Sequence, residues 1–470
     1  MSATISHNLT ITSAVAGEGP PVIDFEGTCL SASTSKYAIG IDNYSESVLV
    51  SISSLTFAGM YCTDTFPAII YIESTLQEGG ISANVTFNGV TFEDINYINT
   101  EMEGATADMQ IPNAIVTVYV PSAADLVAVR MENSLFTHNH AIGMSSTGPL
   151  SFHGQFVGIY NSSFYDMPPI YLIEPHKVNF TKCAFNFNFL FDNPLASFIY
   201  VNSSTQGSEV SFHTCSFKDG YSPAVRIQGP AFLKVRDSLF TGLSNSQLQG
   251  AELTPPHVGS AVAISYIQLE EVATQGSVDI GNCDFVNNGL NEKNRTLPSV
   301  VGVAGFTVLN VENCEFIDNG VMGLALSSVG KNGKVNIKTC TFSGNNGRAI
   351  LLPAHGASNY QTTIQNSNFE NNTLAGNLFG ASIEVGGVAA GTQSKNGAHI
   401  QNCAISGSAV GVFVGLNEHV SMEGMNIQTG VAVKCYQGSV NAENSEINSS
   451  AIQCSGCDFK LNGSDVCAAQ

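Results

Sequence analysis

Short runs of alternating apolar and polar residues recur along the chain, and each run is interrupted once by a pair of polar residues. In residues 335–342, the apolar side chains of Val335 and Ile337 alternate with polar ones, and the alternation resumes at Cys340 and Phe342. Such alternation is typical of a strand with one buried face. These runs show no helical period, so the chain is predicted to be built from short strands.

The interruption inside each run predicts a corner between two strands. In the equivalent run before Phe316, the buried positions change phase between Val311 and Cys314, with Asn313 at the break. A phase change of one residue moves the following side chains to the other face unless the chain turns. Asn tolerates left-handed backbone geometry and hydrogen-bonds within its own turn. We therefore expect a sharp bend at this polar pair.

The run and its corner form a repeat that reads apolar-x-apolar-x-polar-(Cys or Ser)-x-Phe-x-x-Asn. The Phe position is held by Phe57, Phe92, Phe136, Phe164, Phe185, Phe217, Phe240, Phe285, Phe316, Phe342, Phe369 and Phe459, and in divergent copies by Ile405, Ile427 and Ile447. One copy alone cannot bury its apolar face, so the copies must stack as a solenoid. Equivalent residues would then lie about 4.8 Å apart.

Stacking predicts ladders of identical side chains inside the solenoid. Phe285, Phe316 and Phe342 are expected to belong to an internal aromatic stack. A second ladder is expected at the turn after each Phe, from Asn139, Asn188, Asn288, Asn319, Asn345 and Asn372.

The frame resembles a right-handed parallel β-helix of the pectin-lyase-like superfamily. Its Phe-x-x-Asn repeats are similar to those of polymorphic outer-membrane-protein-like surface proteins, although their Gly-Gly-Ala-Ile element is degenerate here, as in residues 347–350. The resemblance implies an all-β solenoid of about 15 or more turns. We expect a single domain over residues 1–470, with longer inserted loops near residues 101–125 and 244–275.

Many of the 12 cysteines occupy one position of the repeat, two residues before the aromatic. These are Cys183, Cys215, Cys283, Cys314, Cys340, Cys403 and Cys457. Other copies place Ser there, as at Ser134, which indicates a tight inward corner and a ladder of buried thiols. Disulfides between neighbouring turns are the alternative, because stacked Cα atoms lie within bonding range. Cysteines off this position are better disulfide candidates, namely Cys29, Cys62, Cys435, Cys454 and Cys467.

A zinc site at Cys454 and Cys457 has the right spacing but is not expected, because both residues fall on inward positions of the frame. His138 and His140 could ligate a metal from one strand face, but their place beside Asn139 favours turn residues. No metal or other cofactor is predicted.

Charge excludes several classes of partner. The chain has 17 Lys and Arg against 38 Asp and Glu, a net charge of −21, and only 12% charged residues. Nucleic-acid binding depends on clustered basic residues, and so does anchoring to an acidic membrane surface. No run of about 18 apolar residues would cross a bilayer. We therefore expect neither nucleic acid as a partner nor membrane insertion.

A surface so poor in charge needs another source of solubility, and the chain carries acceptors for N-linked glycans of the form Asn-x-Ser/Thr. They are Asn8, Asn43, Asn84, Asn161, Asn179, Asn202, Asn294, Asn371, Asn448 and Asn462. Their spread predicts an extracellular or cell-surface glycoprotein. The first residues do not read as a signal peptide, so this sequence would lack it.

Catalytic motifs of β-helix enzymes are missing. The Asp-rich clusters and Gly-His-Gly of polygalacturonases are absent, as are the calcium-binding Asp set and catalytic Arg of pectate lyases. Residues 174–176 (Glu-Pro-His) match the Asp-Pro-His motif of alginate epimerases only weakly. The best carboxylate pair is Asp284 and Glu315, expected to point outward from adjacent turns at about 5 to 6 Å, near the spacing in a retaining glycosidase. A solvated edge is the favoured interpretation of this pair.

Two hypotheses for function follow. The first is a non-catalytic extracellular rod, structural or adhesive, that associates with itself or with other surface or matrix proteins. Because neither end offers a capping helix, we expect either a fragment of a longer surface protein or ends that meet other copies of the chain, and the latter would stack head-to-tail into filaments. The second is a carbohydrate-active enzyme, a polysaccharide lyase or a glycoside hydrolase, or a glycan-binding module. The lack of Trp and the 9% aromatic content, much of it inward Phe, count against a glycan cleft.

Overall fold

The structure is a computed structural model in which most of the chain can be described. The described residues are 9–12, 21–26, 37–42, 48–62, 68–73, 82–98, 115–119, 126–139, 141–142, 150–153, 156–167, 170–173, 175–188, 197–203, 207–221, 223–229, 231–244, 259–265, 276–290, 299–353, 359–372, 381–386 and 397–467. They form short β-strands joined by turns, and within these ranges there is no α-helix. Accordingly, the described part contains no helix with the length and apolar character needed to span a membrane.

The chain divides into two compact units, residues 1–228 and residues 229–470, and each is described by itself. The single domain over residues 1–470 stays a prediction. Of the expected insertions, residues 101–125 and 244–275, most positions lie outside the described residues. The strands β9 (Val116–Tyr119) and β25 (Gly259–Ser265) fall within them and belong to the coils.

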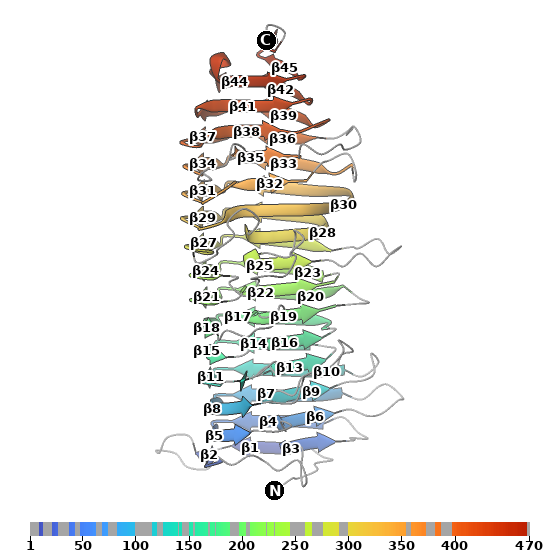
Figure 1. The fold of residues 1–470 in the computed structure, drawn as a ribbon. Helices are drawn as coiled ribbons and strands as arrows, with labels where there is room; N and C mark the ends of the chain where they lie inside the picture. Colours follow the sequence, from blue (N-terminus) through green and yellow to red (C-terminus); the bar gives the residue numbers. More distant parts are fainter. Residues whose placement is uncertain are drawn as a thin grey trace. The chain divides into compact units, whose positions relative to one another are not determined.

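In the first unit, every complete coil contributes three strands, each stacked on the equivalent strand of its neighbours (Figure 1). First strands are β1 (Leu9–Thr12), β4 (Val48–Ser53), β7 (Ser82–Asn88), β10 (Leu126–Glu132), β14 (Phe156–Tyr160), β17 (Lys177–Thr181) and β20 (Ser208–His213). Second strands are β2 (Val22–Asp24), β5 (Thr56–Cys62), β8 (Thr91–Ile98), β11 (Leu135–Thr137), β15 (Ser163–Met167), β18 (Ala184–Asn188) and β21 (Ser216–Lys218). The short β12 (Ala141–Ile142) also pairs with β8. Third strands are β3 (Tyr37–Asp42), β6 (Ala68–Glu73), β9, β13 (Leu150–His153), β16 (Ile170–Ile173), β19 (Ile199–Asn202) and β22 (Val225–Gln228).

The second unit repeats the plan. First strands are β23 (Ala231–Arg236), β26 (Ser277–Gly281), β33 (Gln361–Gln365), β36 (Ala398–Gln401), β39 (His419–Glu423), β42 (Ser439–Glu443) and β45 (Asp458–Leu461). Second strands are β24 (Leu239–Thr241), β27 (Asp284–Val286), β29 (Glu315–Ile317), β31 (Thr341–Ser343), β34 (Asn368–Glu370), β37 (Ala404–Ser406), β40 (Asn426–Gln428) and β43 (Glu446–Ile447). Third strands are β25, β32 (Ile350–Leu352), β35 (Ala381–Val385), β38 (Val410–Val414), β41 (Val431–Tyr436) and β44 (Ile452–Ser455). The long β28 (Ser299–Glu312) and β30 (Met322–Lys338) each serve as a third strand and then as the next first strand.

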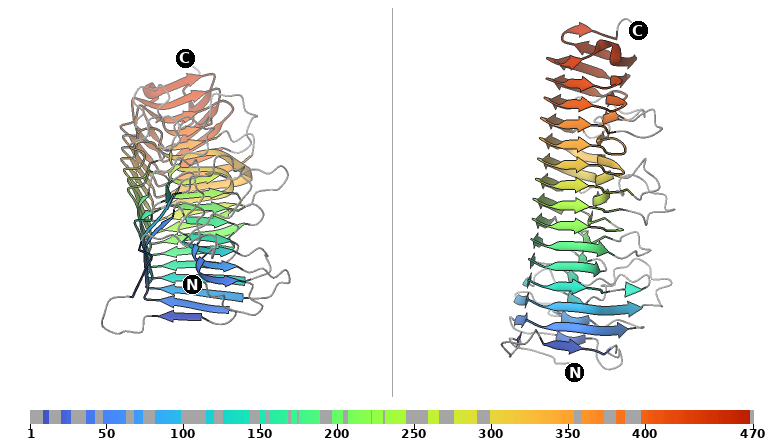
Figure 2. Two further views of the ribbon diagram at one scale, coloured as in Figure 1. Left: turned by 60° about the horizontal axis from the view of Figure 1, so that its bottom comes forward. Right: turned by 90° about the vertical axis from the view of Figure 1, so that its left-hand side faces the viewer.

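These parallel ladders confirm the predicted all-β solenoid, a parallel β-helix in each unit. Figure 2 shows equivalent strands stacked in register from coil to coil. A short 3-10 turn at Ser449–Ala451 and the strand β46 (Ser464–Asp465) depart from the plan, and β46 pairs antiparallel with β45.

Left-handed backbone geometry forms the corners predicted at the polar pair. The residue before each Cys or Ser position has a positive φ, for example 54° at Asn282 and 53° at Asn313. A second left-handed residue follows every repeat Phe except Phe459 by two positions, as at Asp318 (52°) and Gly344 (68°). Asn, Asp and Gly adopt this geometry at the lowest cost, which explains why the repeat places them there.

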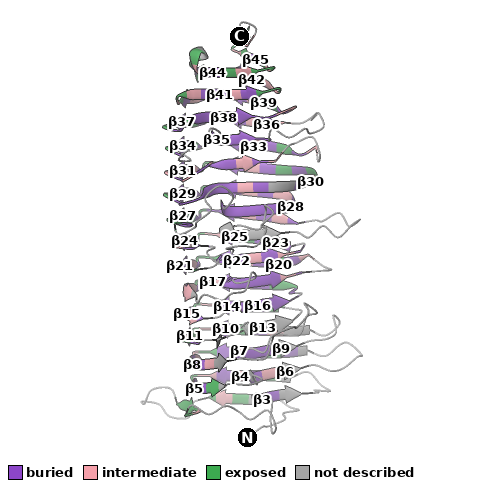
Figure 3. Ribbon diagram, viewed as in Figure 1, coloured by how far each residue is buried: buried purple, intermediate pink, exposed green. Residues whose placement is uncertain are grey.

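The aromatic residues of the repeat form the stacked interior of each unit. In the first unit, the ring centroids of Phe164 and Phe185 lie 4.7 Å apart with an angle of 4° between the planes. In the second, Phe316 and Phe342 are 4.6 Å apart at 7°. The rings are almost completely buried, and Figure 3 shows the buried positions running along the strands.

Buried Asn residues close the turn after Phe136 in the first unit and after Phe285, Phe316, Phe342 and Phe369 in the second, where they form a ladder. The side chain of Asn188 lies outside the described residues. In the second unit, the Nδ2 of Asn319 donates to the carbonyl oxygen of Phe285 in the preceding coil at 3.0 Å and to Asn345 Oδ1 at 2.8 Å. Its own Oδ1 accepts from the backbone N–H of Asn288 at 2.9 Å. Asn319 is only 1% exposed, so these hydrogen bonds replace water for every polar atom of the amide.

We predict that Asn319→Ala lowers the free energy of unfolding by about 3 kcal/mol, because it removes hydrogen bonds from buried donors and acceptors in the two neighbouring coils. The measurement is urea denaturation of the variant and the wild type. Asn336→Ala is the control: this residue lies on the first strand of the next coil, donates one hydrogen bond to Asn310 and is only half-buried. An equal loss of unfolding free energy for the two substitutions would contradict the prediction that the buried Asn ladder stabilises the fold more than a half-buried Asn pair does.

Candidate functional site

The ladder cysteines lie at the inward corners, and six of them are free, buried thiols in the structure: Cys183, Cys215, Cys283, Cys314, Cys340 and Cys403. Each Sγ lies within hydrogen-bonding distance of the carbonyl two residues earlier, as in Cys340 to Lys338 at 3.2 Å. Where Ser replaces Cys, its hydroxyl donates to the equivalent carbonyl, as in Ser367 to Gln365 at 2.9 Å. Cys or Ser therefore places a weak or strong donor near this carbonyl in most copies, while Leu55, Val90 and Met425 are buried at the same position in others.

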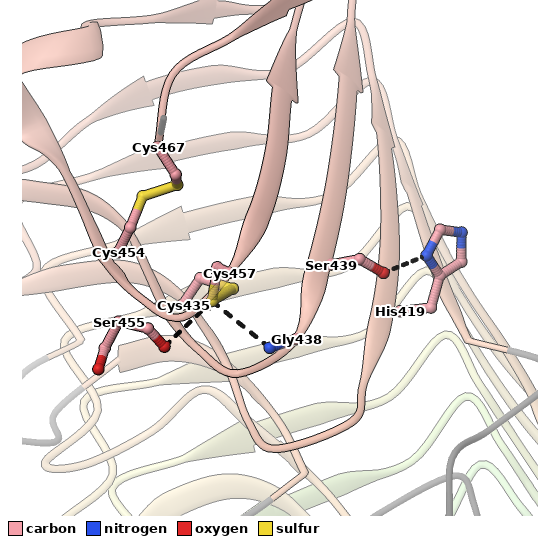
Figure 4. Close-up of a disulfide and its surroundings, with 8 residues drawn as sticks. All are labelled: His419, Cys435, Gly438, Ser439, Cys454, Ser455, Cys457 and Cys467. Atoms are coloured by element: carbon pink, nitrogen blue, oxygen red, sulfur yellow. Dashed lines mark hydrogen bonds between the residues drawn. A yellow bond between two sulfur atoms is a disulfide. The ribbon is translucent and has the colours of Figure 1, made fainter. Parts of the chain in front are cut away.

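Cys457 differs from the other ladder cysteines, because it is bonded to Cys435 rather than free. A second disulfide joins Cys454 to Cys467 (Figure 4). Of the remaining disulfide candidates, Cys29 lies outside the described residues, and so does the side chain of Cys62.

Burial raises the pKa of the Cys403 thiol to about 11, from an ordinary value of 9.0. The unfolded chain therefore loses this proton at a lower pH than the folded chain does. The protonated thiol makes its full contribution to the free energy of unfolding below about pH 9. This contribution is lost as the pH rises through about 11, at about 1.4 kcal/mol per pH unit.

We predict that the wild type loses about 2–3 kcal/mol more stability than Cys403→Ser between pH 9 and pH 11. Urea denaturation of both proteins at several pH values measures the difference, and the other titrating groups, shared by both, cancel. Parallel pH profiles for the two proteins would contradict the prediction.

The proposed carboxylate pair lies where the sequence predicts. Asp284 and Glu315 are register partners on β27 and β29, and both are exposed. Their neighbours along this face, Leu239 and Thr341, belong to equally short strands on adjoining coils. The pair therefore sits on an open strip, where solvent competes for every contact that a substrate would make.

The histidine pair is not brought together as a site in the described structure. His138 has a left-handed φ of 51° at the turn after β11, and its ring packs edge-on against Tyr165. His140 lies outside the described residues. No group of three or more metal-ligating side chains occurs in the described ranges.

The glycan acceptors differ in accessibility. Five are exposed, namely Asn84, Asn161, Asn371, Asn448 and Asn462. Asn179 and Asn202 are half-buried, and Asn8, Asn43 and Asn294 lie outside the described residues. Asn161 uses its Nδ2, the atom that would carry a glycan, to donate to Asn133 Oδ1 at 2.7 Å.

A row of aromatic and polar side chains, not anticipated from the sequence, lies on the outward face of three third strands in the first unit. Tyr171 on β16, Tyr200 on β19 and Arg226 on β22 are consecutive register partners. The tyrosine ring centroids are 5.8 Å apart in an edge-on arrangement. We call this set the Tyr–Arg row.

Two further polar groups belong to the same face. Asn202 and Gln228, register partners two residues after Tyr200 and Arg226, are half-buried. The Tyr200 hydroxyl donates to Gln228 Oε1 at 2.6 Å, which holds the amide in place. The tyrosines are 6% exposed, so their rings form a floor, while Arg226, Gln228 and Asn202 offer polar groups nearer the surface.

Burial governs the ionisation of the Tyr–Arg row. It raises the pKa of both Tyr171 and Tyr200, although the charge of Arg226 opposes the shift at Tyr200. Burial also lowers the pKa of Arg226 to about 10. At neutral pH the row therefore presents neutral hydroxyls beside a partly desolvated guanidinium cation.

The sequence signal for this row is weak but identifiable. The strands read Ile-Tyr-Leu-Ile, Ile-Tyr-Val-Asn and Val-Arg-Ile-Gln, each with one polar or aromatic residue between inward aliphatic ones. Their alignment across coils is set by loops of different lengths, so only the strand register reveals that these residues are neighbours.

A buried ion pair lies on the third-strand face of the second unit. Arg348 Nε donates to Glu384 Oε2, and the two side chains are 15% and 11% exposed. Burial raises the pKa of Glu384, an effect that the neighbouring arginine charge opposes. Glu384 has Leu351 and Phe413 as register partners, so the pair is enclosed by apolar neighbours and is an unsuitable contact point for a polar ligand.

The stacked coils define the class of molecule as a parallel β-helix protein. No family model matches the chain, and no curated protein matches its sequence. Among solved structures it is similar to a PL6 alginate lyase in complex with a trisaccharide, with 9% identity, 98% of this chain and 85% of that chain covered, and a TM-score of 0.34. It is also similar to the catalytic unit of a thermostable GH87 α-1,3-glucanase from Streptomyces thermodiastaticus strain HF3-3, with 8% identity, coverage of 91% and 62%, and a TM-score of 0.30. These likenesses concern the fold.

Proposed function

We propose that this chain is a glycan-binding β-helix protein that holds an acidic carbohydrate against the Tyr–Arg row. The observation that carries the proposal is the register of Tyr171, Tyr200 and Arg226 on one outward face. We also propose that the chain belongs to the pectin-lyase-like superfamily and that its repeats are similar to those of polymorphic outer-membrane-protein-like surface proteins.

The chemistry of the Tyr–Arg row suits an acidic sugar. A guanidinium pairs with a carboxylate through two parallel hydrogen bonds, and partial desolvation strengthens that contact. The amide groups of Gln228 and Asn202 can donate to and accept from hydroxyls. The tyrosine rings give a rigid apolar floor of the kind found in small-molecule sites.

The net charge of −21 repels an approaching polyanion at long range, but it does not prevent a direct contact between a carboxylate and Arg226. At physiological ionic strength the Debye length is about 8 Å. Charges elsewhere on the surface are therefore largely screened, whereas a carboxylate touching Arg226 is not. Weaker binding at very low salt would be the signature of the unscreened repulsion.

We predict that Arg226→Gln weakens binding of an acidic polysaccharide by roughly thirtyfold, the equivalent of about 2 kcal/mol for a lost charge-assisted hydrogen bond. Tyr200→Phe, which frees the Gln228 amide, should cause a smaller loss. The measurement is calorimetric titration of bacterially expressed protein with alginate and polygalacturonate oligomers, with a neutral glucan as the comparison.

Arg130→Gln is the matched control. Arg130 also lies beside a tyrosine of the first unit, with its guanidinium 5.3 Å from the Tyr160 ring centroid, but it is exposed and off the row. Equal losses for Arg130→Gln and Arg226→Gln, or no binding of any acidic oligomer, would contradict the proposal.

The same oligomers test for catalysis. A lyase would release unsaturated products, and a hydrolase would release reducing ends. Asp284→Asn and Glu315→Gln separate the exposed carboxylate pair from the Tyr–Arg row: loss of turnover with binding retained would assign chemistry to that pair.

A second candidate function is an extracellular structural or adhesive glycoprotein, favoured by the exposed glycan acceptors and the two disulfides. Disulfides persist in oxidising compartments outside the cytosol. Secretion from eukaryotic cells followed by glycopeptide mass spectrometry should find glycans at Asn84 and Asn448. Unmodified peptides at every exposed acceptor would count against this candidate.

A further inference from the structure

The last coil that the structure describes ends in an antiparallel hairpin, whereas the other strand pairs in the described ranges are parallel. After β45, residues Asn462 and Gly463 have φ values of 47° and 82°, and the chain returns antiparallel as β46. Positive φ at both central residues, with the sequence Asn-Gly, is the signature of a type I′ turn. The Val466 N–H then donates to the Phe459 carbonyl at 3.0 Å. We call residues 464–467 the strap.

The strap occupies one edge of β45. On its other side, β45 pairs in parallel with β42, as every first strand does with its predecessor. Lys460 and Leu461 instead have Asp465 and Ser464 of the strap as antiparallel partners. An uncovered strand edge is a template for pairing with another chain, so the strap blocks the edge on which a further strand would add.

The strap is kept against β45 by a few backbone hydrogen bonds and one disulfide. Ser464 and Asp465 are exposed, and Val466 and Cys467 are only half-buried. Backbone hydrogen bonds contribute about 1 kcal/mol each. The disulfide from Cys467 to Cys454 on β44 ties the strap across the coil (Figure 4).

The two disulfides of this region differ in accessibility. Cys435 is 1% exposed within β41, while its partner Cys457 is half-buried. Cys454 and Cys467 are both half-buried. Exchange requires that a thiolate reach a sulfur atom. The strap disulfide has two half-buried sulfur atoms and the Cys435–Cys457 disulfide has one, so we expect the strap disulfide to open first.

We propose that the strap is a redox-releasable cover of the β45 edge, and that its release lets this edge pair with the same edge of a second copy of the chain. The strap itself shows that the edge accepts an antiparallel strand. Two copies related by a two-fold axis present β45 to β45 in that antiparallel sense, and such an isologous contact closes at a dimer.

The releasing step is thiol–disulfide exchange with a dithiol reductant. One thiolate of the reductant attacks a sulfur of the Cys454–Cys467 bond, forms a mixed disulfide and expels the other cysteine as a thiolate, which takes up a proton. The second thiol of the reductant then displaces the remaining cysteine. Two electrons pass to the protein, both cysteines become thiols, and the reductant becomes its own disulfide.

This inference is independent of glycan binding, since it depends on residues of the second unit alone. The test uses the full chain in three forms: wild type, Cys454→Ser/Cys467→Ser, and Cys435→Ser/Cys457→Ser as the control that keeps the strap tied. Light scattering after size-exclusion chromatography gives the mass, and hydrogen exchange follows the Val466 amide. Alkylation of mildly reduced wild type, read by mass spectrometry, gives the order in which cysteines open.

The expected result is a monomer for oxidised wild type and for the control, and a concentration-dependent dimer with faster Val466 exchange for Cys454→Ser/Cys467→Ser. Mild reduction followed by alkylation should label Cys454 and Cys467 before Cys435. The same reduction should convert the wild type from a monomer to a dimer. The wild-type result tests the proposal even where the variant does not fold. A released strap with a monomeric protein, dimerisation of the control alone, or first labelling at Cys435 would overturn the proposal.

Discussion

Parallel backbone pairing between successive coils is the constraint on which the rest of this structure depends. Because each strand lies in register on the equivalent strand of the next coil, each inward residue has the equivalent residues of the neighbouring coils above and below it at about 4.8 Å. Aromatic rings such as Phe285 and Phe316 then stack with centroids 4.7 Å apart. A buried polar side chain must find its partners in the same column, which favours amides, since an amide both donates and accepts.

The corners follow from the same constraint. Each coil must turn sharply so that its strands stay stacked on those of the neighbouring coils. Left-handed residues such as Asn313, with a φ of 53°, form these turns. The residue that follows points into the corner, which holds Cys or Ser in most copies and Leu55, Val90 or Met425 in others. Cys and Ser alternate there because each places a donor near the carbonyl two residues earlier. The six ladder cysteines outside disulfides are therefore packing residues, and the bonded cysteines of the described part occur where the regular stack ends.

The candidate binding residues lie on the outward faces of the strands, because the ladders fill the inward faces. The first and second strands present mostly solvated polar residues, while the third strands bear side chains that are largely buried on both faces. The Tyr–Arg row and the Arg348–Glu384 pair both belong to third strands, in different units. In the second, the guanidinium is paired with a carboxylate of this chain, whereas the first combines a guanidinium with the half-buried amides of Gln228 and Asn202. The immediate partner, rather than residue type, therefore separates the candidate binding face from a structural ion pair.

The sequence by itself determined the strand frame, the corners and the Phe and Asn ladders, because each depends on a local pattern repeated in every copy. It also placed Asp284 beside Glu315, since both occupy the same position of adjacent repeats. The Tyr–Arg row could not be predicted, because loops of unequal length separate Tyr171, Tyr200 and Arg226, and only the tertiary register aligns them. The tertiary structure also decided that Cys457 bonds to Cys435 while the other described ladder cysteines stay free. Disulfide pairing depends on which sulfur atoms meet in space, and the repeat gives Cys457 the same local pattern as the others.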